Sequence, residues 1–215
     1  VIISDAFQDC LTECQQIAQQ CGVSESEIDF LLSSATDINL PDDSVDVVVL
    51  RSVLVHILDK LPAIREFYRV LKPGGRVSFF EPIISKNTRY HEIIDPVKFP
   101  NYDKLREIEE GLMSDQNDPL MNFDDESLRQ ELQSVGFKNI DIDIEVQTSG
   151  YKVSAGMIEP WFNTPPRPGS LTVKQKYEQF LSQEEVDEFI ERLKVELDGR
   201  EIVLKAPTAY VYAEK

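Results

Sequence analysis

The sequence predicts an α/β fold in which helices flank a mostly parallel sheet. Two short stretches support this prediction, Val47–Leu50 and Val77–Phe80. Short runs of β-branched and aromatic residues are typical of parallel strands covered on both faces. A helical repeat separates the two stretches, so strand, crossover and strand form one right-handed βαβ unit. Ligands of such units bind beyond the carboxyl ends of the strands, and we expect functional residues near Arg51–Val53 and Glu81–Ile83.

The crossover between these strands is predicted to be an amphipathic helix. Asp59 can cap its amino end, and Lys72-Pro73-Gly74-Gly75 ends it. The apolar residues that recur at helical spacing are Leu61, Ile64, Tyr68 and Leu71.

The last third of the chain supplies two further helices and a strand. Asp124 or Asp125 can begin one helix, which Gly136 ends. The capping box Ser182–Glu185 begins a second helix, which runs to Gly199. Between the helices, isoleucines alternate with acidic residues over Ile140–Val146, which predicts an edge strand with one solvated face.

Three segments resemble a known family: DINLPDDSVDVVV, LRSVLVHILDK and REFYRVLKPGGRVSFFEP. They are similar to motifs of the class I S-adenosylmethionine-dependent methyltransferases, especially small-molecule enzymes of the quinone-biosynthesis type. Val1–Asp5 and the helix Gln8–Gln20 resemble that family's second strand and the helix after it. The resemblance covers roughly residues 1–84. It implies a Rossmann-like sheet whose last strand, Thr208–Ala213, is antiparallel and lies between the strands at Val77 and Ile140.

One part of the family pattern is not in this sequence. The first strand and its Gly-x-Gly-x-Gly loop should precede Val1, and none of the nine glycines forms a Gly-x-Gly pair. The chain begins with valine instead of methionine, so we expect that the missing strand belongs upstream. That strand is central in the family's sheet. We therefore expect no hydrogen-bonded ladder between the strand at Val1 and the strand at Asp46.

The resemblance implies which residues hold S-adenosylmethionine. Asp5 ends a strand, where a carboxylate can accept hydrogen bonds from both ribose hydroxyls. Ala6 would lie against the adenine, and Ser34 and Ala35 follow the apolar strand Ile28–Leu32 where the family contacts the adenine amino group. The alternative for Asp5 is a solvated acid at the end of a strand.

Arg51 and Ser52 follow the buried strand and complete the expected cofactor-binding set. An arginine there needs an anionic partner, because an unpaired charge near the core is costly. The cofactor carboxylate, an acidic substrate or Glu81 could supply that partner. A purely structural pair between Arg51 and Glu81 is the alternative.

Tyr90 and His91 are the candidate catalytic residues, with Asp95 as a further acid–base candidate. They lie in a segment that should face the acceptor of the methyl group. His56 lies between Val55 and Ile57, so we expect packing there instead of catalysis. We interpret Glu109-Glu110 and the acidic stretch at 115–118 as a solvated face.

The chain is predicted to be a single methyltransferase domain over residues 1–215, incomplete at its amino end, with insertions at 85–123 and 151–181. Both insertions could roof the active site. They hold more aromatic and thioether side chains than a simple connection needs, which suits a planar or lipophilic acceptor. The alternative is that these side chains only form a small core of their own.

Composition narrows the possible partners. The net charge is −17, from 39 acidic and 22 basic residues, and would repel the phosphates of nucleic acids. The sequence has no long apolar run and no signal-peptide pattern, so we expect a soluble, cytoplasmic protein with no membrane span. Cys10, Cys14 and Cys21 are expected to face the core or a cavity instead of a metal, and no metal site is expected.

These patterns predict an enzyme that transfers a methyl group from S-adenosylmethionine to a small-molecule acceptor. One alternative is a non-catalytic binding or scaffold protein that keeps the fold without the cofactor loop. A nicotinamide-dependent dehydrogenase shares the acid at the end of the strand, but it would need a Gly-x-Gly-x-x-Gly loop and usually a Tyr-x-x-x-Lys site, and neither is in the chain. The oligomeric state is not predicted.

Overall fold

The computed structural model describes residues 1–24, 26–166 and 169–215, so Pro168 of the second predicted insertion lies outside the described residues. The chain divides into two compact units. Unit 1 consists of Val1–Pro82, Phe123–Ile144 and Ala209–Lys215. Unit 2 consists of Ile83–Asn122 and Glu145–Thr208, and it contains nearly all of both predicted insertions.

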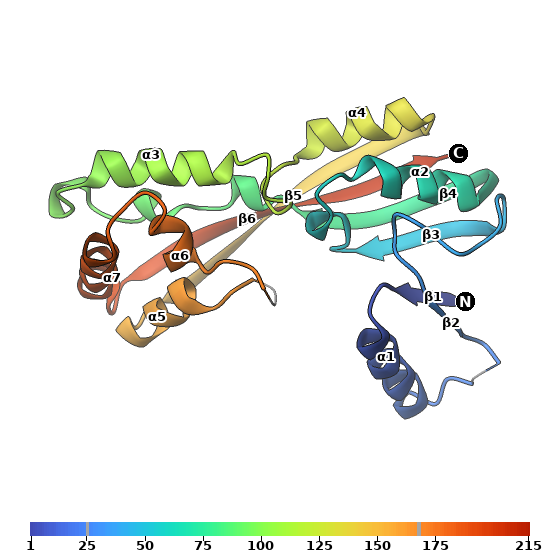
Figure 1. Ribbon diagram of the computed structural model, residues 1–215, viewed down its shortest axis with the longest axis horizontal. Helices are drawn as coiled ribbons and strands as arrows, with labels where there is room; N and C mark the ends of the chain where they lie inside the picture. Colours follow the sequence, from blue (N-terminus) through green and yellow to red (C-terminus); the bar gives the residue numbers. More distant parts are fainter. Residues whose placement is uncertain (25, 167–168) are drawn as a thin grey trace. The chain divides into compact units, whose positions relative to one another are not determined.

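Two parallel strands form the first sheet of unit 1. β1 (Ile2–Asp5) pairs with β2 (Asp29–Leu32), with Asp5 opposite Leu32 at the carboxyl ends. Helix α1 (Gln8–Gln20) connects them and packs against both strands (Figure 1). Only Leu11 of this helix is buried, because the sheet it covers is two strands wide.

Four strands form the second sheet, in the order β3-β4-β6-β5. They are β3 (Val45–Arg51), β4 (Leu71–Pro82), β6 (Glu201–Glu214) and β5 (Lys138–Lys152) (Figure 1). β3 and β4 are parallel. Gly74 and Gly75 exchange backbone hydrogen bonds with Lys215, which joins the start of β4 to the end of β6 and makes that pair antiparallel. The predicted place of the last strand is confirmed.

The expected separation of the strands at Val1 and Asp46 is also confirmed. Among the described residues, β1 and β3 belong to different sheets. One expectation for β3 is wrong, because the strand is not covered on both faces: the side chain of Val49 is 75% exposed and that of Val47 is 40% exposed. β3 is an edge strand of its sheet, so a run of β-branched residues that is typical of a central strand remains partly in solvent.

Helices α2 (Leu61–Val70) and α4 (Asp125–Val135) pack against each other in unit 1. The N-cap of α2 is Lys60, one residue after the predicted Asp59, whose carboxylate accepts a hydrogen bond from the backbone of Leu61. The helix ends one residue early, so Leu71 begins β4. Asp124 caps α4, and Gly136 ends it with a left-handed φ of 111°, which a side chain rarely adopts.

The cysteine prediction is wrong. Cys10 and Cys21 are exposed and Cys14 is partly exposed, and all three are free thiols. Helix α1 turns only a narrow face toward β1 and β2, so the cysteines at its other positions meet solvent. No group of three or more His, Cys, Asp or Glu side chains within the described ranges could hold a metal ion.

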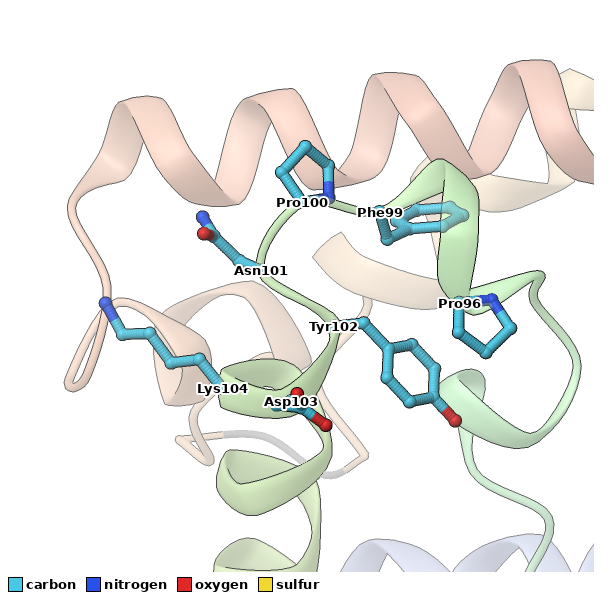
Figure 2. A pocket seen from close by; sticks show the side chains of 7 residues that line it. All are labelled: Pro96, Phe99, Pro100, Asn101, Tyr102, Asp103 and Lys104. Atoms are coloured by element: carbon cyan, nitrogen blue, oxygen red, sulfur yellow. The ribbon is translucent and has the colours of Figure 1, made fainter.

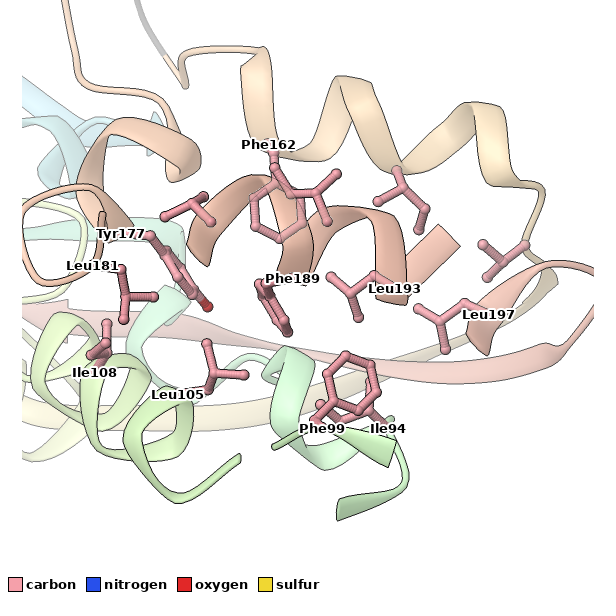
Figure 3. Packing of buried hydrophobic residues seen from close by; sticks show 14 of the residues in the cluster. Ile94, Phe99, Leu105, Ile108, Phe162, Tyr177, Leu181, Phe189, Leu193 and Leu197 are labelled. Atoms are coloured by element: carbon pink, nitrogen blue, oxygen red, sulfur yellow. The ribbon is translucent and has the colours of Figure 1, made fainter. Parts of the chain in front are cut away.

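Unit 2 has a core of its own, built mainly from helices. These are α3 (Tyr102–Met113), α5 (Ala155–Asn163), α6 (Val173–Tyr177) and α7 (Gln183–Leu197), with short 3₁₀ helices η2 (Ile84–Lys86), η3 (Tyr90–Glu92) and η4 (Pro96–Lys98). Figure 3 shows Phe162, Tyr177 and Phe189 at the centre of this core. Phe99 and Phe162 are buried in it, and Tyr90, Tyr151 and Trp161 pack against it. These aromatic side chains therefore contribute to a core within unit 2.

Candidate functional site

The carboxyl ends of β1 and β2 lie next to each other in unit 1. The backbone N–H of Ser33 donates to the carbonyl of Asp5 at 2.9 Å, so the residues that follow the two strands start from neighbouring points. The Asp5 side chain is fixed, because its Oδ1 accepts a hydrogen bond from the backbone of Phe7 at 2.8 Å. Its other carboxylate oxygen accepts no hydrogen bond from the described residues. Asp5 thus offers a held carboxylate with one oxygen open to a ligand.

The other residues of this edge are accessible. Ala6 and Ser34 are exposed and Ala35 is partly exposed. The hydroxyl of Ser34 shares a hydrogen bond of 2.8 Å with that of Thr36, so it is engaged locally and is a weaker candidate for binding adenine through its side chain. Phe7 presents an aromatic ring that is 69% exposed directly after Ala6.

The chain after β3 takes a strained conformation that a buried carboxylate stabilises. Ser52 has a φ of 52°, in the left-handed region that residues other than glycine rarely adopt. Glu81, at the end of β4, has no exposed surface and accepts backbone hydrogen bonds from the next three residues, Val53, Leu54 and Val55, at 2.9 to 3.0 Å. Burial raises the pKa of the Glu81 carboxyl above 4.5, and these three hydrogen bonds oppose that rise.

The geometry does not support a structural pair between Arg51 and Glu81. Both oxygens of Glu81 face backbone N–H groups, and the guanidinium of Arg51 lies over the ring of Phe80 at 4.9 Å from its centroid. Arg51 is exposed. Its charge is thus stabilised by solvent and by a cation–π contact, and it remains accessible to an anionic group.

The structure brings some predicted cofactor residues together and keeps others apart. Asp5 and Ala6 lie beside Ser34 and Ala35 through the pairing of β1 with β2. Arg51 ends β3 in the other sheet, and Ser52 directly follows it.

The two candidate catalytic residues, Tyr90 and His91, lie in η3 of unit 2. The ring of Tyr90 stacks on that of Phe162 at 4.9 Å and on that of Trp161 at 6.1 Å. Burial and the nearby Glu109 carboxylate raise the pKa of Tyr90 well above its usual value of 10, so it remains a neutral phenol. The Nδ1 atom of His91 lies 2.5 Å from Oε2 of Glu109.

Glu109 is a residue that sequence reasoning missed. We expected it on a solvated acidic face, but its side chain is 4% exposed and contacts two other elements of unit 2, η3 and α6. The signal is present in the sequence: Glu109 falls at helical spacing within the apolar stripe of Leu105, Ile108 and Leu112 in α3. An acid on the buried face of an amphipathic helix requires hydrogen-bond or ionic partners, so this spacing predicts that Glu109 is a buried, paired carboxylate.

Two further predictions are resolved by the structure. His56 is exposed, so the expected packing of its ring among apolar neighbours is wrong. Asp95 is exposed and caps η4, where it accepts a hydrogen bond from the backbone of Val97. That local role weakens the case for Asp95 as an acid or base.

A surface pocket of about 450 Å³ opens at the start of α3 (Figure 2). Its lining side chains all come from the segment between Pro96 and Lys104. Tyr102 belongs both to this pocket and to the surroundings of His91, because its hydroxyl donates to the carbonyl of His91 at 3.2 Å. No residue of the predicted cofactor or catalytic sets lines this pocket.

Comparisons with known proteins agree with the sequence resemblance. Residues 2–79 match a family described as a methyltransferase domain. The ubiquinone/menaquinone biosynthesis C-methyltransferase UbiE of Escherichia coli is 24% identical over 169 residues, which cover 74% of this chain and 61% of that protein. The chain therefore spans less than two thirds of the length of these curated relatives.

Solved structures share the fold. A candidate methyltransferase from Bacillus halodurans superposes with a TM-score of 0.59 at 15% identity, over all of this chain and 82% of the other. Phosphoethanolamine N-methyltransferase 2 from Haemonchus contortus, solved with phosphomonomethylethanolamine and S-adenosylhomocysteine, gives 0.53 at 17% identity over all of this chain and 43% of the other. The chain has the Rossmann-like fold of the S-adenosylmethionine-dependent methyltransferases, and the predicted resemblance is confirmed. None of the helices described in the structure is both long enough and apolar enough to cross a bilayer.

Proposed function

We propose that the protein carrying this chain transfers a methyl group from S-adenosylmethionine to a small-molecule acceptor. The observation that supports this most directly is Asp5, a carboxylate held at the end of β1 with one oxygen open, in a chain with the methyltransferase fold. An acid at this position, beside the end of a second parallel strand, suits a ligand with two adjacent hydroxyls.

The residues of this edge fit the adenosine half of the cofactor. Asp5 would accept hydrogen bonds from the ribose, and Ala6 with the exposed ring of Phe7 offers an apolar surface for adenine. Ser34 and Ala35 would lie at the adenine edge. Arg51 and Ser52 would face the charged end of the cofactor, since Arg51 is accessible and lacks a carboxylate partner within the described residues. The cofactor would supply the activated methyl group.

For the acceptor we propose a planar or lipophilic small molecule that the insertions at 85–123 and 151–181 cover. The support is the set of rings that are only partly buried at the edge of the unit 2 core: Tyr90, Tyr151 and Trp161. A net charge of −17 disfavours nucleic acid as a substrate. A single methyltransferase domain and a cytoplasmic location also belong to this proposal.

Calorimetry on the natural full-length protein tests the proposed function. S-adenosylhomocysteine should bind with one site per chain, and titration of a hydrophobic quinol into that complex should quench the part of the tryptophan emission that Trp161→Phe removes. If S-adenosylhomocysteine does not bind, the proposal is refuted and the scaffold alternative gains support. If it binds but the quinol leaves the emission unchanged, the lipophilic acceptor is refuted.

A further inference from the structure

All five N–H groups of the Arg69 guanidinium, near the end of α2 in unit 1, are engaged. Nε and Nη2 donate to the two carboxylate oxygens of Glu66 at 2.8 and 2.7 Å, which forms a bidentate pair within the helix. Nη2 also donates to the carbonyl of Ile38 at 2.7 Å, and Nη1 donates to the carbonyl of Leu40 at 2.8 Å and to Asp42 at 2.7 Å. Arginine has five such donors, so this side chain is saturated.

Glu66 and Arg69 together bind both backbone groups of Ile38. Oε2 of Glu66 accepts a hydrogen bond from the Ile38 N–H at 2.7 Å, while Arg69 donates to the carbonyl of the same residue. The hydrogen bond from Arg69 lowers the pKa of the Glu66 carboxyl below its usual value of 4.5, and the same pairing raises the pKa of Arg69. Both side chains are therefore charged at neutral pH. We call this pair the Glu66–Arg69 clamp.

The residue that the clamp holds lies directly after a turn formed by residues 34–37. This turn contains the two residues after β2 that are expected to contact adenine. The hydroxyl of Ser33 closes the base of the turn, because it donates to the carbonyl of Asp37 at 2.8 Å and accepts from the backbone N–H of Asn39 at 2.9 Å. Ile38 lies between these two contacts, so its position sets the position of the turn.

Hydrogen bonds hold this segment in place more than apolar packing does. Every residue from 33 to 44 is described, and none of them has a buried side chain. The side chains of Arg69 and Glu66 are 30% and 18% exposed, so the clamp is partly shielded from water that would compete for its hydrogen bonds. The clamp therefore determines where the turn lies relative to α2.

We infer that Glu66 and Arg69 are positioning residues for the adenine-contacting turn at residues 34–37. The inference rests on the proposed function, in which Ser34 and Ala35 lie at the adenine edge. Neither charged side chain has to touch the cofactor, because the clamp fixes Ile38 and Ile38 fixes the turn. A turn that is free to shift would lose its contacts with the purine while the fold remains, since polar contacts depend steeply on position.

Amide hydrogen exchange in the natural full-length protein tests the clamp without any ligand. In the wild type the amide of Ile38 should be protected, because it donates to Glu66. In Arg69→Gln the amides of Ile38 and Asn39 should exchange about tenfold faster, while the amides of β1 should keep their wild-type rates. Arg65→Gln, which changes an exposed arginine of the same helix, is the matched control and should alter none of these rates.

Two results of this experiment would overturn the inference. The first is an unprotected Ile38 amide in the wild type, and that measurement needs no variant to fold. The second is exchange in Arg69→Gln that accelerates equally throughout unit 1, because a general loss of stability would then explain the effect.

Ligand binding tests what the clamp does for the cofactor site. The probes are S-adenosylhomocysteine and its inosine analogue, in which a carbonyl replaces the 6-amino group of the purine. The wild type should prefer S-adenosylhomocysteine, and Arg69→Gln should bind it about tenfold more weakly, which corresponds to about 1.4 kcal/mol. The inosine analogue should lose little, so the preference shrinks in Arg69→Gln and persists in Arg65→Gln. A loss of stability alone would not change this preference in the folded protein.

The outcomes separate this inference from the proposed function. An Arg69→Gln variant that folds and keeps the wild-type preference would overturn the inference. If Arg69→Gln does not fold, Glu66→Gln takes its place; it should bind S-adenosylhomocysteine about threefold more weakly, and unchanged binding would overturn the inference. If the wild type does not bind S-adenosylhomocysteine, the proposed function fails, and exchange of the Ile38 amide still decides whether the clamp holds the turn.

Discussion

Oε1 of Glu81 lies 2.9 Å from the backbone nitrogen of Leu54, and this contact joins the end of β4 to the segment that follows β3. The same carboxylate binds the backbone nitrogens of Val53 and Val55. It thereby maintains the unusual conformation at Ser52, where the expected ligand-binding edge of the second sheet begins.

Replacement of Glu81 should destabilise unit 1 strongly. Glu81→Ala leaves three backbone donors without their acceptor, and each buried unsatisfied donor costs roughly 1–3 kcal/mol. Water entering the space will satisfy some of them, so we expect the free energy of unfolding to fall by about 3 kcal/mol in urea denaturation. Asp141→Ala, on the solvated face of β5, should change it by less than about 0.5 kcal/mol. Equal effects of the two variants would contradict this account of Glu81.

The pH dependence of stability should carry a contribution from Glu81. Its pKa is raised in the folded state, so the folded chain holds this proton more tightly than the unfolded chain. The contribution to the free energy of unfolding is therefore largest below about pH 4.5, falls as the pH rises through the folded-state pKa, and is constant above it.

Urea unfolding of wild type and Glu81→Gln between pH 4 and pH 8 measures this contribution. The glutamine does not titrate. The unfolding free energy of wild type, relative to that of Glu81→Gln, should therefore fall as the pH rises through the folded-state pKa of Glu81 and then stay constant. A difference that stays constant with pH would show that Glu81 titrates alike in both states.

The core of unit 2 should depend on Phe162. Its side chain has no exposed surface and contacts Tyr90, Tyr177 and Phe189 with ring centroids 4.9 to 5.9 Å apart. Phe162→Ala should cost about 3–5 kcal/mol of unfolding free energy, from the lost burial and the cavity that remains. Phe180→Ala is the matched control, because that ring is 53% exposed, and it should cost less than about 1 kcal/mol. Comparable losses would mean that the aromatic cluster is not a packed core.

Most elements of the fold could be predicted because their signals are local. Caps and apolar spacing locate α4 after Asp124 and α7 after Ser182, and alternation locates the solvated face of β5. These patterns arise whenever a helix or strand has one buried side. They therefore predict the element without any information on which other part of the chain covers that side.

The errors that affect the candidate site concern what covers a side chain. The run around Val49 is typical of a central strand, but exposure depends on neighbouring strands and helices that no local pattern specifies. Glu109 belongs to an acidic segment, and its burial follows from contacts with His91 and Tyr177, which lie 18 and 68 residues away. Long-range contacts of this kind decide the candidate site more than they decide the fold.

The central claim is that Asp5 binds the ribose of the cofactor, and calorimetric titration of S-adenosylhomocysteine into the natural full-length protein tests it most directly. Asp5→Ala should weaken binding by roughly 1.5–3 kcal/mol, the range for hydrogen bonds to a charged group. Asp9→Ala, one turn further along in α1, should bind as wild type does. An unchanged dissociation constant for Asp5→Ala, with the variant folded, would contradict the account and leave Asp5 as a solvated acid at the end of a strand.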